Sequence, residues 1–186
     1  VPFEMGEVKT EVKYEDYDIE HHTLDRSYHT LFDGLFIKIK QDKVIPCTIY
    51  IRKKLLFSKS LFVPSNKTLN KKNIANTLFE EIDMDDSDFE KLYFVKTDNR
   101  ILTMQIFTSS LLRYIVDFKT KYKIIPEITI KKEKIYLRFS INTTLFEPHP
   151  LKSPLSYSEV QRQYIFINSI MQICKDLIKN INEIEL

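Results

Sequence analysis

The stretch HTLFDGLFIKIK, which spans residues 29–40, decides the fold of this chain. Three apolar residues of its second half share one face of an extended chain: Leu35, Ile37 and Ile39. Successive side chains of a strand point to opposite faces of a sheet, so this alternation predicts a strand with one buried face. Two structures remain open at Gly34. Either Asp33 and Gly34 form the two-residue turn of a hairpin, or Gly34 marks a bulge within one long strand.

Further strands are expected on both sides of this stretch. Alternating or β-branched residues predict them at four places: 7–14, 47–52, 92–95 and 101–107. Apolar residues alternate again at 128–130 and at 135–141, and the charged residues 131–134 lie between them. We interpret these three segments as a hairpin with residues 131–134 at its tip.

Two longer helices are predicted, together with a short one at 74–82. The middle helix begins near Thr108, where hydroxyl side chains are placed to cap free backbone N–H groups. Its apolar residues recur at helical spacing: Leu111, Ile115, Phe118 and Tyr122. The final helix follows a capping box at 156–159, and we expect it to reach about Ile181.

The final helix allows two interpretations. Some of its apolar residues alternate at spacings of four and three, as in a coiled-coil seam: Val160, Tyr164, Ile167, Met171, Cys174, Ile178 and Ile181. Others widen this stripe: Phe166, Ile170, Ile173 and Leu177. A wide stripe fits a helix packed on a sheet better than a two-stranded coiled coil. Self-association through the narrow seam stays open as the second interpretation.

Composition indicates one globular domain over residues 1–186, with 43% hydrophobic and 29% charged residues. The chain has only 2 glycines, so neither a G-x-G-x-x-G nor a Walker phosphate-binding loop can be written. Cys47 and Cys174 lack the spacing of metal ligands, and we interpret both as buried thiols. We therefore predict an α+β fold: an antiparallel sheet of about six strands, with the middle helix and a long C-terminal helix packed on one face.

Several segments resemble, in order, those of one bacterial family. They are HTLFDGLF at 29–36, DFEKLYFV at 88–95, IFTSSLL at 106–112 and LFEP at 145–148, followed by the final helix. Together they resemble the family known as domain of unknown function 3137. Ser109 stands where that family usually has proline at its helix start, so the chain keeps the cap and loses the preset φ angle.

This resemblance implies no activity. It implies a parent protein with a pair of hydrophobic segments upstream, of which the present chain would be the soluble part. The first residue is Val1 rather than methionine, which agrees with a fragment. We therefore expect a membrane-tethered domain on the cytoplasmic side of the membrane.

Two segments contain residue types that bind metal ions. The densest cluster of possible ligands comprises His21, His22, Asp25 and His29. No histidine pair in it has the i, i+4 spacing of a helical zinc site. Residues 83–90 resemble the start of a calcium loop, but Asp88 replaces its glycine and Phe94 its bidentate glutamate. We interpret both segments as solvated loop and strand residues, without a metal or another cofactor.

Charge is segregated along the chain, although the net charge is only +2. Between residues 38 and 72 a single acid, Asp42, accompanies these bases: Lys38, Lys40, Lys43, Arg52, Lys53, Lys54, Lys59, Lys67, Lys71 and Lys72. Residues 80–90 contain acids and no base. The basic stretch suits an anionic phospholipid surface. Nucleic acid is the competitor, but no basic helix or RNA-binding signature supports it. Alternatively, the lysines only solvate outer strand faces and prevent edge pairing.

We expect a non-enzymatic binding or scaffolding domain that contacts an anionic membrane surface or a protein partner. The residues expected to form the anionic-surface site are Lys38, Lys40, Arg52, Lys53, Lys54, Lys71 and Lys72. The alternative is a small-ligand-binding or hydrolytic domain with a pocket near residues 29–36 and the acidic segment 80–90. No catalytic residue is assigned, because the chain lacks a nucleophile elbow and neither cysteine has the surroundings of an activated thiol.

Overall fold

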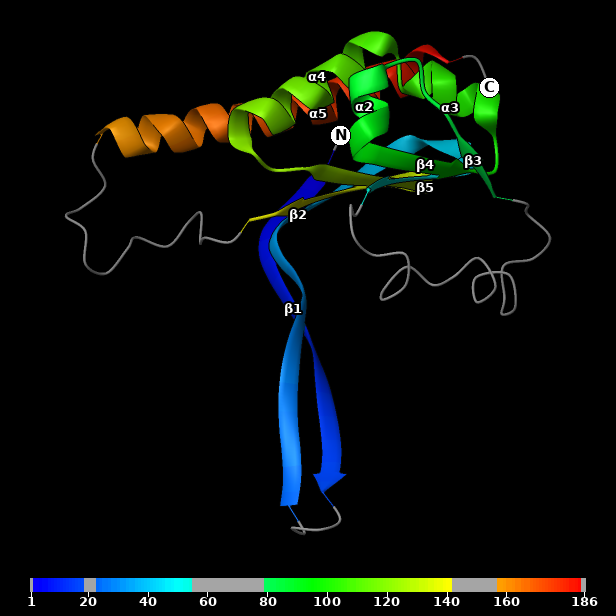
Figure 1. The fold of residues 1–186 in the computed structure, drawn as a ribbon. Helices are drawn as coiled ribbons and strands as arrows, with labels where there is room; N and C mark the ends of the chain where they lie inside the picture. The colour runs from blue at the N-terminus through cyan, green and yellow to red at the C-terminus, as the bar shows by residue number, and fades with distance from the viewer. Residues whose placement is uncertain (1, 19–22, 55–78, 142–156, 185–186) are drawn as a thin grey trace.

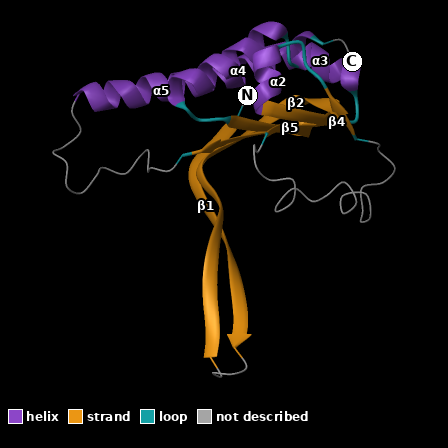
Figure 2. Cartoon of the chain, viewed as in Figure 1, coloured by secondary structure: helices purple, strands orange, loops and turns teal. Residues whose placement is uncertain are grey.

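The computed structural model describes residues 2–18, 23–54, 79–141 and 157–184. Its elements are β1 (Phe3–Asp18), β2 (Thr23–Lys53), β3 (Glu80–Ile82), α2 (Ser87–Leu92), β4 (Tyr93–Thr97), α3 (Arg100–Ile106), α4 (Ser109–Tyr122), β5 (Pro126–Ser140) and α5 (Tyr157–Glu183). Five strands form one antiparallel sheet, and the helices cover one of its faces (Figure 1; Figure 2). The predicted α+β fold is confirmed. Within the described residues, no helix is both long enough and apolar enough to span a bilayer.

The long strand β2 organises the sheet, and residues 29–40 lie in its middle. β2 pairs with β1 through residues 23–39, with β5 through residues 34–51 and with β4 at its carboxyl end. Gly34 has φ 148°, and a Cβ there would lie 2.7 Å from the amide nitrogen of Ile141. Only glycine fits such a backbone approach, so Gly34 continues one long strand and is not a hairpin turn. The strands expected at 29–40 and at 47–52 are likewise parts of this one strand, β2.

The predicted hairpin at 128–141 is wrong, because β5 is one continuous strand antiparallel to β2. Lys134 lies opposite Lys40 and Lys132 lies opposite Ile45, so the charged segment stays within the ladder. The buried residues of β5 change from even to odd numbers across this segment, and this change of phase imitates a turn. Instead, Lys132 adopts φ 54° and the register shifts. Such an irregularity changes the alternation without reversing the chain.

Residues 101–107 were predicted to be extended, but they contain helix α3. The side chain of Asn99 accepts a hydrogen bond from the backbone N–H of Leu102 at 3.1 Å and caps the helix. Leu102, Thr103 and Ile106 are buried, which is the spacing of one helix face. A short apolar run is ambiguous between strand and helix, and here the cap decides for the helix.

The prediction of a short helix at 74–82 is also wrong for the residues that the structure describes. Residues 80–82 form strand β3, which pairs with β4 at the edge of the sheet. Residues 74–78 lie outside the described residues. The first residues of the acidic segment 80–90 therefore add a short strand to the sheet, beside β4.

Helix α4 packs against the sheet through its predicted stripe. Leu111, Ile115 and Phe118 are buried, and Tyr122 packs at the edge of this core. Thr108 precedes the helix as its N-cap residue, but its hydroxyl makes no capping hydrogen bond. That hydroxyl instead lies 3.3 Å from the side-chain amide nitrogen of Asn180 on α5. The side-chain cap predicted there is therefore replaced by a contact between the two helices.

Helix α5 extends two residues beyond the predicted Ile181, to Glu183. The residues that widen its stripe are all buried: Phe166, Ile170, Ile173 and Leu177. The sheet-packing interpretation is confirmed for this part of the helix. The amino-terminal turns of α5 extend past the sheet (Figure 1), and there Val160 and Tyr164 are 47% and 66% exposed. Ser156 of the predicted capping box lies outside the described residues.

Candidate functional site

Some of the basic residues predicted to bind an anionic surface are paired with acids. Lys38 Nζ lies 3.0 Å from Glu4 Oε1 on the neighbouring strand β1. Lys54 Nζ lies 3.4 Å from Glu90 Oε2, which belongs to the predicted acidic segment. Both lysine side chains are partly buried. The charge segregation seen along the sequence is thus partly cancelled in space.

Other predicted residues remain exposed. Lys40 and Lys53 have exposed side chains at separate places on β2, whereas residues 71–72 lie outside the described part of the chain. Lys40 lies directly opposite Lys134, and Lys131 of the same strand is exposed. Like charges in directly opposite positions destabilise a sheet. An anion bound beside Lys40 and Lys134 would relieve this repulsion.

Arg52 belongs to a shallow hollow of about 180 Å³ that sequence reasoning did not find. Its guanidinium donates a hydrogen bond to the Thr129 hydroxyl at 2.9 Å. Arg138 Nε donates to Glu127 Oε2 at 2.7 Å. Burial lowers the pKa of Arg52, and the nearby guanidinium of Arg138 lowers it further while Glu127 opposes both. Glu127 thus pairs with Arg138, and the guanidinium of Arg52 lies in the same hollow, beside the rings of Phe36 and Tyr136.

The acidic segment uses its carboxylates to support the fold. Asp86 accepts hydrogen bonds from the backbone N–H groups of Asp88 and Phe89, at 2.9 and 2.8 Å, and thereby caps α2. Glu90 accepts a hydrogen bond from the N–H of Met84 at 2.7 Å. This segment, expected to be a loop, therefore contains the start of a helix. Within the described residues, no group of three or more side chains could hold a metal ion.

The histidine cluster is only partly described. His29 is exposed on β2, and its ring centroid lies 5.0 Å from that of Tyr14 on β1, edge to face. His21 and His22 lie outside the described residues. Of the cluster, the described part thus shows one exposed histidine packed against a tyrosine.

The structure does not bring together the two segments of the alternative pocket. Residues 29–36 pair with β1, whereas residues 80–82 reach β2 only through β4, which pairs with residues 49–53. The stretch of β2 between these pairings separates the two segments, and a strand rises by about 3.3 Å per residue. One small pocket cannot span that distance.

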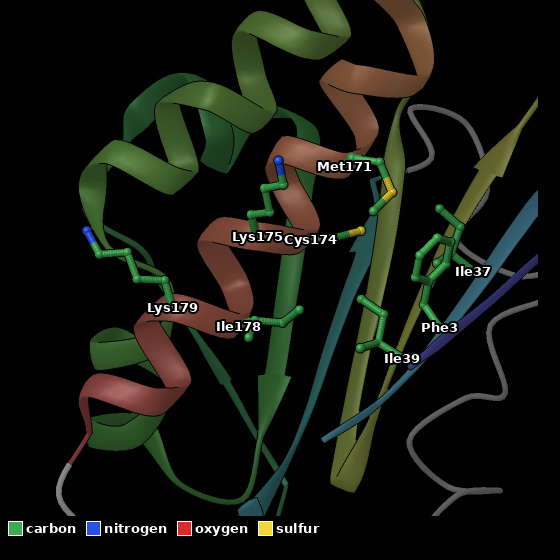
Figure 3. Close-up of a pocket in the computed structure, with 8 residues that line it drawn as sticks. All are labelled: Phe3, Ile37, Ile39, Met171, Cys174, Lys175, Ile178 and Lys179. Carbon is green, nitrogen blue, oxygen red and sulfur yellow. The ribbon is translucent and has the colours of Figure 1, made fainter. Parts of the chain in front are cut away.

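A groove of about 330 Å³ lies between the sheet and α5 (Figure 3). Its apolar lining comes from both layers: Phe3, Ile37 and Ile39 on the strands, and Met171, Cys174 and Ile178 on α5. Lys175 and Lys179 of α5 complete the lining. Burial raises the pKa of the Cys174 thiol to about 12, so this side chain is a neutral part of the wall. Sequence reasoning missed the groove, because a periodic pattern does not show how far a helix covers a sheet.

The paired ends of β1 and β2 project away from the sheet and the helices (Figure 1). We call residues 10–18 and 23–32 the ribbon. In the described part of the chain, these residues of β2 pair only with β1, since the pairing with β5 begins at Gly34. Several large apolar side chains of the ribbon are exposed: Tyr14, Tyr17, Tyr28 and Leu31.

Comparisons with known proteins give a family and a distant structural likeness. No curated protein matches the chain. A crystal structure of the mycobacterial trehalose monomycolate transport factor A, TtfA, is similar with a TM-score of 0.36 and 8% identity, over 90% of this chain and 71% of that one. The profile described as "Protein of unknown function (DUF3137)" matches residues 30–179. Most of the chain lies within this match, and the chain therefore belongs to the DUF3137 family.

Proposed function

We propose that this chain is a non-enzymatic binding or scaffolding domain that contacts a protein partner through the ribbon. One observation carries the proposal: the ribbon leaves the sheet and exposes tyrosine and leucine side chains to water. A two-stranded hairpin without further packing is only marginally stable in water. A partner that covers the exposed rings would stabilise the ribbon and bury amphipathic tyrosines of the kind enriched at interfaces.

The charge of the ribbon favours a basic partner surface. Its residues include the acids Glu11, Glu15, Asp16, Asp18 and Asp25, against the bases Lys13 and Arg26. A partner with cationic side chains would complement this excess of acids.

In this proposal the sheet and helices hold the ribbon away from a membrane to which upstream segments tether the domain. The domain stands on the cytoplasmic side, as the family resemblance led us to expect.

Site-specific photo-crosslinking in cells that produce the full-length parent tests the ribbon. A photoreactive amino acid replaces Tyr14 or Tyr28, and the matched control replaces Tyr157, which is also exposed but lies on α5. We expect one discrete protein adduct from the ribbon positions and none of that mass from the control. Adducts of equal yield from all three positions, or none from the ribbon, would contradict the proposal.

An anionic membrane surface is the second candidate, and the facing pair of Lys40 and Lys134 favours it. Each lysine near an anionic surface contributes about 1 kcal/mol, so Lys40→Ala with Lys134→Ala should weaken binding to anionic vesicles by at least about tenfold. Lys121→Ala on α4 is the control, since Lys121 is exposed on the helical layer. Co-sedimentation measures the effect. Equal binding to neutral and anionic vesicles would exclude this candidate.

A further inference from the structure

We propose that the groove between β1, β2 and α5 binds the acyl chain of a single-chain amphiphile, whose anionic head group lies beside Lys175 and Lys179. This site is separate from the ribbon and from the Lys40–Lys134 pair. It lies on the helical side of the sheet, at the edge that α5 leaves open (Figure 3).

The groove is apolar where α5 stops covering the sheet. Phe3 and Met5 lie opposite Ile39 and Ile37 in the register of β1 and β2, so these side chains share one face of the sheet. Ile37 and Ile39 are buried, yet Phe3 and Met5 remain 49% and 37% exposed. The apolar face therefore continues past its cover into water, where an acyl chain would gain free energy by burying it.

The size of the groove favours a single chain. Its volume of about 330 Å³ is near the lower end of the range of small-molecule pockets, roughly 300–1,000 Å³. A stable interface with another protein buries about 800 Å² on each partner, which calls for a much larger surface. Met171 also contributes a flexible thioether to the wall, which adapts to the irregular shape of a bound chain.

The charges beside the groove select the head group. Lys175 and Lys179 begin at the groove on α5, and Figure 3 shows their amino groups on the outer side of the helix, away from Ile37 and Phe3. Lys179 Nζ lies 3.8 Å from Glu183 Oε1. Within the described residues, no acidic side chain pairs with Lys175. A carboxylate or phosphate at the mouth would meet one uncompensated charge, that of Lys175, once this flexible side chain turns toward the groove, while the acyl chain lies among apolar side chains.

Calorimetric titration of the full chain with laurate and with lauroyl lysophosphatidylglycerol, both below their micelle concentrations, tests the site. We expect saturable one-to-one binding of at least one of them. Tighter binding of laurate points to a free fatty acid, and tighter binding of the lysolipid points to a phospholipid-derived ligand. Absence of saturable binding by both would overturn the proposal.

Two variants locate the binding. Met171→Trp fills the groove from a half-exposed position, and the loss of room for about two methylenes weakens binding about tenfold. Phe3→Ser removes an exposed wall residue and serves as the second variant if Met171→Trp does not fold. If Met171→Trp and Phe3→Ser both fold and both bind the amphiphile with unchanged affinity, the proposed location is overturned. Neither substitution touches the ribbon, so ribbon crosslinks should persist and the two proposals fail independently.

A charge reversal tests the head group. Lys175→Glu should weaken laurate binding about fivefold, the effect of roughly 1 kcal/mol from an exposed charge, and should change the affinity for neutral dodecyl maltoside less than about twofold. Lys121→Glu on α4 is the control with the same change of charge. The anionic specificity would be overturned if Lys121→Glu weakened laurate binding as much as Lys175→Glu does. It would also be overturned if Lys175→Glu weakened the binding of laurate and of dodecyl maltoside equally.

Discussion

The two halves of β2 form one continuous strand, but their surroundings differ. From Gly34 to Ile39 the strand has neighbours on both edges and helices over one face, and Leu35, Ile37 and Ile39 are almost completely buried. In the ribbon, the same strand pairs only with β1, and Tyr28 and Leu31 are exposed. Stability therefore resides in the covered half, and the exposed half is free to bind.

The largest expected effect is the loss of a large side chain from the covered half. Phe139 of β5 is completely buried, and its ring centroid lies 5.6 Å from that of Phe118 on α4. Phe139→Ala should lower the free energy of unfolding by about 3–5 kcal/mol, because it removes buried apolar area and leaves a cavity. Urea unfolding measures the change.

Tyr28→Ala in the ribbon is the matched control for this prediction. Because Tyr28 is 62% exposed, its truncation should change the free energy of unfolding by less than about 0.5 kcal/mol. If Phe139→Ala and Tyr28→Ala lower the free energy of unfolding by similar amounts, side chains of the ribbon contribute as much to stability as those of the covered half.

The junction between the halves should be the next most sensitive place. Gly34→Ala forces a side chain into the left-handed φ region and against the backbone of Phe139, which should cost about 2–4 kcal/mol of unfolding free energy. Gly6→Ala is the control, because no atom lies within 4 Å of the Cβ it would add. Thermal unfolding distinguishes the two. A stable Gly34→Ala protein would argue for a flexible junction.

The two native thiols should report the covered half. Burial raises the pKa of Cys47 and of Cys174 to about 12, so at pH 8 their thiolate populations, and hence their rates with Ellman's reagent, should be at least about a hundredfold lower than for an exposed thiol. A Tyr28→Cys variant supplies the exposed thiol on the ribbon. Equal rates for all thiols would show that the covered half opens freely.

The same thiols predict a pH dependence. Their pKa values are raised on folding from an ordinary value of 9.0, so the folded state holds its protons longer than the unfolded state. This contribution is fully present below pH 9 and is lost as the pH rises toward 12. Urea unfolding of Cys174→Ala should show a weaker decline in the free energy of unfolding over this pH range than the unsubstituted chain shows.

The smallest effect on stability is expected at the exposed end of α5. We propose that any self-association of the chain uses this part of the seam, where Val160 and Tyr164 are exposed. Val160→Glu with Tyr164→Glu should leave the unfolding free energy nearly unchanged and shift a dimer toward monomer in sedimentation velocity. If the unsubstituted chain stays monomeric at high concentration, self-association through this surface is excluded.

Local pattern accounts for the elements that were predicted correctly. The alternation at 35–39 predicts a one-sided strand, and the wide stripe of α5 predicts a helix packed on a sheet; the structure confirms both. The errors lie where a pattern changes phase or is short. The change of parity in β5 suggested a turn, although the strand continues through Lys132 and the register shift. The run at 101–107 was too short for its period to exclude the helix that Asn99 caps.

The candidate site was less accessible to sequence reasoning. The lysines between residues 38 and 54 formed a basic run in the sequence, but Lys38 and Lys54 meet acids from other segments. Arg138 and Glu127 were not singled out, although they lie beside Arg52 in the folded chain. A pairing between segments so far apart leaves no local signal in either of them.

By itself, the sequence determined the α+β class, the packed face of the final helix, the lack of glycine-rich phosphate loops and the family. Each of these depends on residue types, on spacings within segments and on the order of the segments along the chain. Tertiary structure alone decided that β2 is continuous, that its first half stands free as a ribbon, and that α5 leaves a groove beside Phe3. Which strands pair and how far a helix covers them depend on contacts between distant segments, and residue periodicity contains no record of those contacts.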